Sequence, residues 1–251
     1  MNISLYQAAA ALNANSRWQD AIAENLASSS IPGYKRQDYS FSAVQAGLMQ
    51  GVAASGAGSA PHFSLPEGRG RINFAPGQLK PTGVDTDLAI EGPGFFEVQL
   101  PNGDTAYTRD GEFQLNAQGQ LVTKQGYAVI GDSGTIQLDR NSRGSLNISS
   151  EGQISQGNQV RGKLKVVTFG DPQLLAHVGG GYFQPRDQAV QPTDLPEATV
   201  KQRFLEAANT SPVTEMVNLL AAMRYYETNQ RLVQLNDERM STAIRDLAGA
   251  S

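Results

Sequence analysis

Between residues 216 and 247, apolar side chains recur at alternating intervals of three and four residues. This spacing gathers them on one face of a helix, as in the seam that one helix of a coiled coil presents to its partner. Ser211 and Pro212 favour a helix start, because serine caps a first turn and proline is tolerated at the first helical position. Gly249 favours the end. The pattern predicts a C-terminal helix whose seam, interrupted at two polar positions, contains Met216, Leu219, Met223, Tyr226, Val233, Met240, Ile244 and Leu247.

A weaker, alanine-rich repeat of the same kind covers residues 5–26. Its centre is polar, with Asn15 and Gln19 on the repeat. Pro32 and Gly33 follow it, and proline disfavours helical geometry in the residue before it. The repeat predicts an N-terminal helix whose apolar seam contains Leu5, Leu12, Ile22 and Leu26.

The predicted C-terminal helix needs a partner. At about 1.5 Å per residue it spans roughly 55 Å, which a chain of this size cannot cover in a compact ball. In one alternative, both terminal helices pack onto a globular core. In the other, they form an antiparallel pair with both termini at one end, so that Leu12 lies near Met240. Asn15 then lies beside Asp237, and a polar layer of this kind fixes the register.

From about residue 71 the period changes from 3.6 to 2. Phe96 and Val98 alternate with Glu97, as in a half-buried strand, and Asn102 and Gly103 then supply the positive φ angles of a hairpin turn. Short apolar runs separated by glycines about every eight residues predict an antiparallel β domain. The expected fold is therefore α+β. Residues 1–45 and 206–251 form a terminal helical domain, whose two helices pair as an antiparallel coiled-coil-like unit. Between them lie linkers at residues 46–70 and 185–205 and the β domain at residues 71–184.

Composition excludes several classes of protein. The formal net charge is −4 without a basic block, which argues against nucleic-acid binding. Cysteine is absent, so disulfides and thiolate zinc sites are excluded. No apolar run reaches the ~18 residues of a membrane span. The first five residues have neither a basic region nor a continuous apolar stretch, so we expect no cleaved signal peptide.

Candidate chemistry is sparse. The two histidines, His62 and His177, have no second ligand at metal-binding spacing. The glycines around Pro93 lack the third glycine of a phosphate-binding loop. Arg109 and Asp110 have the pattern of a hairpin-turn pair, and Trp18, off the N-terminal seam, is expected at an interface. We therefore expect no catalytic, cofactor-binding or metal site, and no enzyme activity.

Five blocks of sequence, in order, resemble the flagellar rod and hook proteins, known together as axial proteins. The first block is residues 25–35, and the last is residues 215–229. Between them lie residues 87–96, 107–111 and 119–123. The chain is short for a hook protein, and residues 77–79 and 131–134 look more like the proximal than the distal part of the rod. The family motif of the first block is carried by Asn25, Leu26, Ala27, Pro32, Gly33 and Tyr34.

The resemblance implies a structural subunit of the basal-body rod. Such a subunit polymerises through its terminal helices into a helical drive shaft that transmits torque. It also implies a periplasmic location, export through the flagellar type III apparatus without signal cleavage, and self-association alongside other rod and hook subunits. Two alternatives remain open: a hook or hook-associated subunit, and a secreted β-rich binding module. The second would need a pocket with convergent polar groups.

Overall fold

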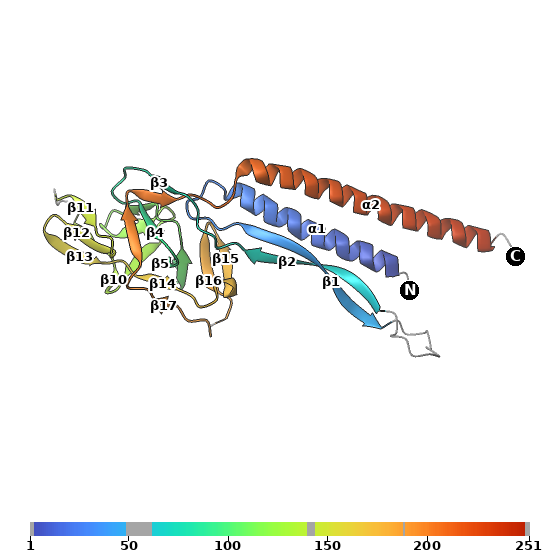
Figure 1. Cartoon of the computed structure of the whole chain (residues 1–251), viewed down its shortest axis with the longest axis horizontal. Coiled ribbons are helices and arrows are strands. Elements are labelled where there is room, and N and C mark those ends of the chain that lie inside the picture. The colour runs from blue at the N-terminus through green and yellow to red at the C-terminus, as the bar shows by residue number, and fades with distance from the viewer. Residues whose placement is uncertain (1–2, 49–61, 140–143, 188, 249–251) are drawn as a thin grey trace. The chain divides into compact units, whose positions relative to one another are not determined.

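The chain folds into two long helices and a large set of antiparallel strands, so its fold class is α+β (Figure 1). The computed structural model describes residues 3–48, 62–139, 144–187 and 189–248. Its elements form two compact units. Unit 1 comprises Met1–Leu26, Gln37–Arg71 and Pro212–Ser251, and unit 2 comprises Ala27–Arg36 and Ile72–Ser211. The short segment that follows the N-terminal helix therefore belongs to unit 2.

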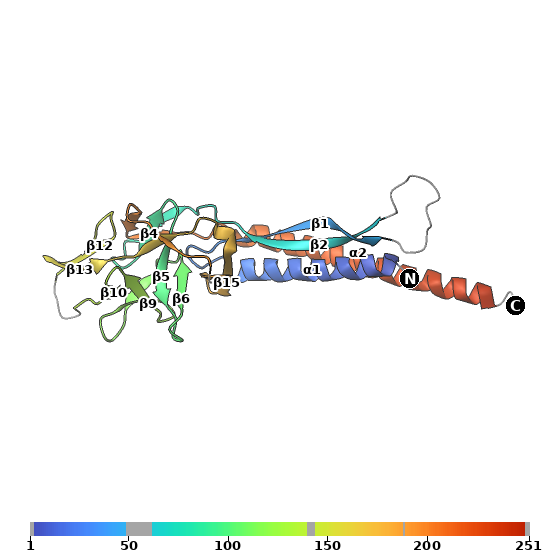
Figure 2. The ribbon, with the colours of Figure 1, turned by 90° about the horizontal axis from the view of Figure 1, so that it is seen from below.

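Unit 1 consists of the two helices and a two-stranded sheet. Helices α1 (Ile3–Ala27) and α2 (Pro212–Ala248) run antiparallel, and strand β1 (Gln37–Leu48) pairs with β2 (His62–Ile72). Figures 1 and 2 show both strands running along α1. Both predicted helices are confirmed, and α2 begins at Pro212, as predicted. No helix in the described ranges is long and apolar enough to cross a membrane.

The linker predicted for residues 46–70 is replaced by strand structure at its described ends. Strand β1 continues to Leu48 and β2 begins at His62, while residues 49–61 lie outside the described residues. A Cβ on Gly68 would lie 2.2 Å from the Tyr39 hydroxyl. Gly68 therefore makes room for the Tyr39 ring on the facing strand. Amino-acid composition alone cannot distinguish such a glycine from one in a flexible linker.

Unit 2 contains the remaining strands, all paired antiparallel where a register is described. They are β3 (Leu79–Pro81), β4 (Leu88–Glu91), β5 (Phe95–Gln99), β6 (Thr105–Thr108), β7 (Phe113–Leu115), β8 (Leu121–Thr123), β9 (Ala128–Gly131), β10 (Gly134–Thr135), β11 (Leu146–Ile148), β12 (Gln153–Gln156), β13 (Gln159–Lys163), β14 (Val166–Thr168), β15 (Leu175–Gly179), β16 (Tyr182–Pro185), β17 (Thr193–Asp194), β18 (Thr199–Gln202) and β19 (Phe204–Glu206). A 3₁₀ turn, η1 (Pro172–Leu174), precedes β15.

The largest sheet has ten strands, with the path β15-β16-β6-β5-β9-β8-β7 and with β10, β14 and β17 attached beside it. Strands β11, β12 and β13 form a second sheet. Two further pairs, β18 with β4 and β19 with β3, join the stretch before α2 to the start of the β region. The linker predicted for residues 185–205 is therefore wrong over β17, β18 and β19. Val200, only 3% exposed, shows that this stretch contributes to the core.

Strand β5 is central, with β6 on one side and β9 and β14 on the other. Its hairpin to β6 is confirmed, although only Gly103 there takes a positive φ (87°). The prediction of a half-buried strand is too simple, because β5 is buried on both faces. Phe96 and Val98 belong to the larger apolar cluster and Phe95 to the smaller one. A strand with neighbours on both sides and packing on both faces does not show a strict alternation.

Candidate assembly surface and its buried support

Helix α2 has one face turned towards α1. Ala222, on this face, is fully buried, and its carbonyl oxygen accepts hydrogen bonds from Asn15 Nδ2 and Gln19 Nε2 of α1, both at 3.3 Å. Glu215, seven residues earlier, is 1% exposed. The amide side chains of Asn15 and Gln19 thus fix this carbonyl of α2 to α1.

The opposite face of α2 is apolar and exposed. We call Val213, Met216, Val217, Leu220 and Met223 the exposed α2 face; their side chains are between 48% and 71% exposed. They lie at the i, i+3, i+4, i+7 spacing that places residues on one side of a helix. Single exposed apolar residues are ordinary, whereas contiguous exposed apolar patches are typical of interaction sites.

The predicted C-terminal seam coincides only in part with the face that packs on α1. Leu219 and Val233 are half-buried, whereas four members are at least 37% exposed: Met216, Met223, Tyr226 and Met240. On α1, Ile22 is 2% exposed and Leu12 and Leu26 are half-buried. The side chains of Leu5, Ile244 and Leu247 lie outside the described residues.

The predicted register of the helix pair is wrong. It places Asn15 beside Asp237 and Leu12 near Met240, yet Asn15 contacts Ala222, about two heptads closer to the start of α2. The antiparallel direction is as predicted. The face of α2 that packs on α1 includes the buried Ala222, which is not a member of the predicted seam.

The family motif closes the loop after α1. Asn25 is 1% exposed, and its Oδ1 accepts from Gln37 N at 2.8 Å while its Nδ2 donates to Gln37 O at 2.9 Å. These two bonds imitate a strand pair across the ends of the loop. Within unit 2, Tyr34 is 1% exposed and its ring lies 5.3 Å from that of His177. Asn25 and Tyr34 of the motif are thus interior residues that contact other parts of the chain.

A buried cluster of charges holds together three distant parts of unit 2. Glu206 Oε1 accepts from Lys35 Nζ at 2.6 Å and from Gly77 N at 2.7 Å, and Oε2 accepts from Arg109 Nη1 at 3.1 Å. The side chains of Lys35, Arg109 and Glu206 are 2%, 7% and 1% exposed. We call these three residues the charge clamp. It joins the segment after α1, the end of strand β6 and the segment before α2.

Lys35 and Arg109 also donate to backbone oxygens. Lys35 Nζ donates to Ala75 O at 3.0 Å, and Arg109 Nη2 donates to Gly92 O at 2.6 Å. Burial lowers the pKa of Lys35 and of Arg109, and the charge of Glu206 opposes this in both cases. The expectation that Arg109 forms a turn pair with Asp110 is therefore wrong, because its guanidinium is an interior group. The partners are too far apart in sequence for a local pattern to reveal them.

Asp110, which follows Arg109 in the sequence, is expected to make the stability of the fold depend on pH. It is 5% exposed, and burial raises its pKa from 3.8 to about 6, although Glu112 N donates to its Oδ1 at 2.9 Å. Between these two values the folded chain binds more protons than the unfolded one, so stability falls as pH rises through this window.

The substitution Asp110→Asn removes this dependence of stability on pH, because asparagine does not titrate. We expect the variant to be as stable as the parent near pH 3 and more stable at pH 7 by about 1.5–3 kcal/mol, from a shift of about two units at ~1.4 kcal/mol each. Urea unfolding at both pH values measures this. The matched control is Asp104→Asn in an exposed turn. Equal pH slopes for Asp110→Asn and the parent would contradict the prediction.

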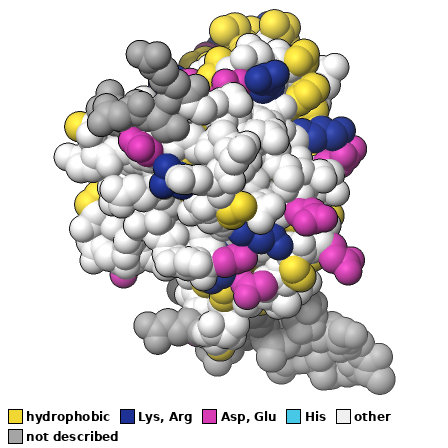
Figure 3. Space-filling model, turned by 90° about the vertical axis from the view of Figure 1, so that its left-hand side faces the viewer, with side chains coloured by type: hydrophobic (Ala, Val, Ile, Leu, Met, Phe, Trp, Pro, Cys, Tyr) yellow, Lys and Arg dark blue, Asp and Glu magenta, His cyan; other side chains and the backbone are white. Residues whose placement is uncertain are grey.

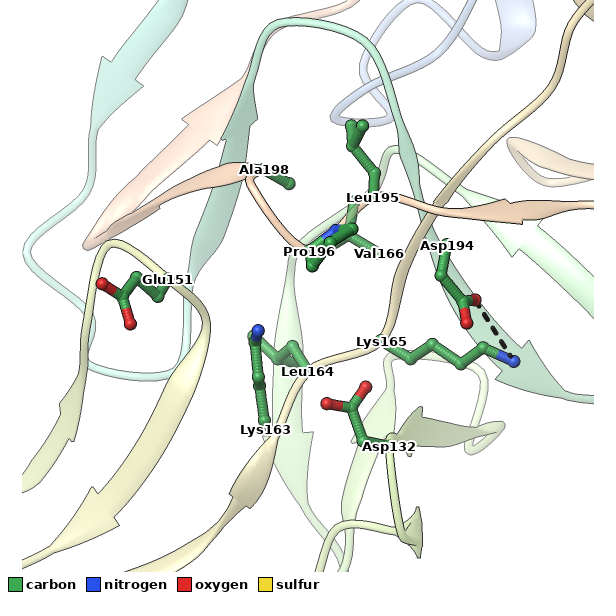
Figure 4. Close-up of a pocket in the computed structure, with 10 residues that line it drawn as sticks. All are labelled: Asp132, Glu151, Lys163, Leu164, Lys165, Val166, Asp194, Leu195, Pro196 and Ala198. Atoms are coloured by element: carbon green, nitrogen blue, oxygen red, sulfur yellow. Dashed lines mark ion pairs between the residues drawn. The ribbon is translucent and has the colours of Figure 1, made fainter.

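Unit 2 also has a pocket of about 270 Å³ (Figure 4). Figure 4 shows Asp132 beside Lys165 and Glu151 on the far side. Lys165 Nζ lies 3.0 Å from Glu97 Oε2 and 3.9 Å from Asp194 Oδ1, so its charge is committed to carboxylates of the fold. Among the described residues no group of three His, Cys, Asp or Glu side chains could hold a metal ion. On the face drawn in Figure 3, acidic and basic side chains are interspersed.

Comparison with known proteins places these features in a family. A family model described as the flagellar hook protein FlgE/F/G D1 domain matches residues 89–156, and one described as the flagellar basal body rod FlgEFG protein C-terminal matches residues 201–246. The flagellar basal-body rod protein FlgG of Buchnera aphidicola subsp. Schizaphis graminum is 31% identical over 258 residues, covering 94% of this chain and 96% of the relative. FlgF of Caulobacter vibrioides is 33% identical over 229 residues, covering 91% of each chain. FlgG of Borreliella burgdorferi is 30% identical over 259 residues, covering 96% and 97%.

Proposed function

Because the chain belongs to the flagellar basal-body rod protein family, we propose that it polymerises through its terminal helices into a rod that transmits torque. The observation that supports this most strongly is the exposed α2 face. Five large or β-branched apolar side chains there are each about half exposed or more. In water such a stripe favours association, since burial contributes about 25 cal/mol for each Å² of apolar surface.

The charge clamp supports transmission of torque. A rod subunit must carry force between its terminal helices and its β region without local unfolding. The chain segments that lead out of α1 and into α2 are tied to each other inside unit 2 by the Lys35 to Glu206 ion pair. A backbone bond from Gly33 N to Glu206 O, at 2.6 Å, adds to it. Separating the partners of a buried ion pair leaves uncompensated buried charges, which costs more than breaking an exposed pair.

The partners in this proposal are copies of the same chain and other rod and hook subunits. The subunit lies in the periplasmic part of the basal body and leaves the cytoplasm through the flagellar type III apparatus without signal cleavage. It acts without catalysis, cofactor or metal, and it neither binds nucleic acid nor inserts into the membrane. The absence of cysteine suits a chain that is exported unfolded and must avoid mispairing.

Deletion and complementation test this function. Loss of the gene is expected to remove hook and filament while the inner membrane ring persists. The parent gene restores them. A gene that carries Met223→Glu, on the exposed α2 face, is not expected to restore hook and filament, because a carboxylate there opposes association. The monomer of this variant is expected to keep the circular dichroism of the parent. The matched control is Val160→Glu, at a 62% exposed apolar position of unit 2, which restores motility. Normal hooks and filaments in the deletion strain would contradict the proposal.

A further inference from the structure

Unit 1 contains a groove of about 570 Å³ between α1, β1 and α2. Four aromatic side chains line it: Trp18, Tyr39, Phe41 and Tyr225. Trp18 packs edge-on against Phe41 at 5.5 Å between ring centroids and lies 6.1 Å from Tyr225. Phe41 is 50% and Tyr225 62% exposed, so the rings form an open apolar surface. We call this the aromatic groove.

The floor of the aromatic groove lacks a hydrogen-bond donor. Asn15 lines the groove and is 3% exposed; its Nδ2 is used by Ala222 O, and its Oδ1 has no partner among the described residues. The buried Tyr39 hydroxyl likewise has no partner within the described part of the chain. Leaving such a group unsatisfied costs about 1–3 kcal/mol. An occupant that fits the groove therefore has an apolar body and a donor at its tip.

The C-terminal half of α2 carries that combination. Leu232 and Leu235 are 50% and 54% exposed, and the exposed Arg239 follows on the same face at i+7 from the first leucine. Helix α2 has 37 residues against 25 in α1, and Figures 1 and 2 show its end continuing past the start of α1. A guanidinium has only donors, and it also favours aromatic faces.

The same chain cannot supply this segment to its own groove. Tyr225, in the groove wall, lies on the same continuous helix as Leu235, only about 15 Å away along the axis. A helix cannot fold back onto itself over that distance, so a second molecule must provide the segment. The two surfaces differ, and contacts of this heterologous kind build rings or open filaments rather than closed dimers.

We propose that the aromatic groove of one copy receives residues 232–239 of α2 from a second copy. The two leucines pack on Trp18 and Phe41, and Arg239 donates to Asn15 Oδ1. This is the helix-in-groove mode of recognition, read as anchors at i, i+3 and i+7. The inference rests on the proposed function and names one of the contacts that would join subunits along the polymer.

Trp18 reports on the groove, since it is the only tryptophan in the chain. The full-length protein at low concentration is titrated with a synthetic peptide of residues 229–248. We expect a saturable change in Trp18 emission. The same peptide with Arg239→Ala binds roughly tenfold more weakly, because a hydrogen bond to a charged group is lost. A matched peptide with Arg245→Ala, beyond the docked segment, binds like the parent. Equal affinities for the Arg239→Ala and parent peptides would overturn the proposal.

Cross-linking provides a second measurement in the absence of native cysteines. Protein with Ala11→Cys, in the groove wall, is mixed with protein carrying Leu235→Cys, and we expect a disulfide-linked dimer. The control mixes Ala11→Cys with Val160→Cys, an exposed position of unit 2. Equal yields from the two mixtures overturn the groove contact. If the yields are equal but deletion of the gene abolishes hook and filament, only the groove contact is wrong and the proposed function stands. If the deletion strain has intact hooks, the proposed function itself is wrong.

Discussion

Replacement of Glu206 by glutamine is expected to destabilise unit 2 by about 3–5 kcal/mol, which is the typical cost of removing one partner from a buried ion pair. Glutamine keeps the size of the side chain and an acceptor oxygen but removes the negative charge. Lys35 and Arg109 then remain as two buried cations without a counter-charge. The cost comes from those stranded cations rather than from lost packing.

Thermal unfolding measures the effect. For a chain of this length each kcal/mol shifts the midpoint by roughly 2–4 °C, so a decrease of roughly 6–20 °C is expected. The matched control is Asp85→Asn, which breaks the ion pair from Arg203 Nε to Asp85 Oδ1 at 2.7 Å. Its two side chains are 58% and 47% exposed, and such pairs contribute about 0–1 kcal/mol. Equal shifts for the two variants would show that the clamp has no special role.

The loss in Glu206→Gln should shrink as pH rises. Burial lowers the pKa of Lys35 below its ordinary 10.5, and removing the Glu206 charge lowers it further. In the window between the folded value and 10.5 the unfolded chain binds more protons, so stability rises with pH. The variant has the wider window because its Lys35 is neutral over a larger pH range. The difference in unfolding midpoint between variant and parent is expected to narrow from pH 7 towards pH 10, and a constant difference would count against this account.

Gly33→Ala is the second substitution with a large expected effect. Gly33 has φ of +67°, and a Cβ there would lie 2.3 Å from the backbone carbonyl carbon and oxygen of Arg109. The left-handed conformation alone costs a non-glycine residue about 1–2 kcal/mol. Overpacking against backbone that cannot rotate away adds about 1–3 kcal/mol. Because Arg109 belongs to the charge clamp, the displacement also disturbs the ion pair with Glu206.

Gly83→Ala separates the two contributions. Gly83 has a similar φ of +76°, but nothing lies within 4 Å of the position that a Cβ would take there. This variant should therefore lose only the conformational part. Chemical denaturation of both variants gives the comparison: Gly33→Ala is expected to be less stable than Gly83→Ala by about 1–3 kcal/mol. Equal losses would mean that the loop moves away from Arg109 at little cost.

The sequence predicted those helices and strands whose formation depends on residues close together in the chain. Both terminal helices follow from the 3.6-residue period and from Pro32 and Pro212, and the β5–β6 hairpin follows from the turn at Gly103. The strand at residues 62–72 was missed. Its glycines make room for the Tyr39 ring, but they also give the segment a composition like that of a flexible linker. Local composition does not reveal what lies across the strand.

The candidate surface was predicted only in outline. Periodicity identified α2 as a helix with an apolar seam, but it did not identify the face that packs on α1. That face includes the buried Ala222, whereas Met216, Met223 and Met240 of the predicted seam remain exposed. The aromatic groove was anticipated only through Trp18, because its other walls come from β1 and α2.

By itself the sequence determined that this protein has a helix at each end, an antiparallel β region between them and the motifs of the axial proteins, since period, turn residues and short motifs are properties of neighbouring positions. Only the tertiary structure decided the register of the helices, the pairing of Lys35 and Arg109 with Glu206, and which face of α2 is exposed. Those features join residues up to 207 positions apart. Their energies depend on burial and on direct contact, which arise only when the chain has folded.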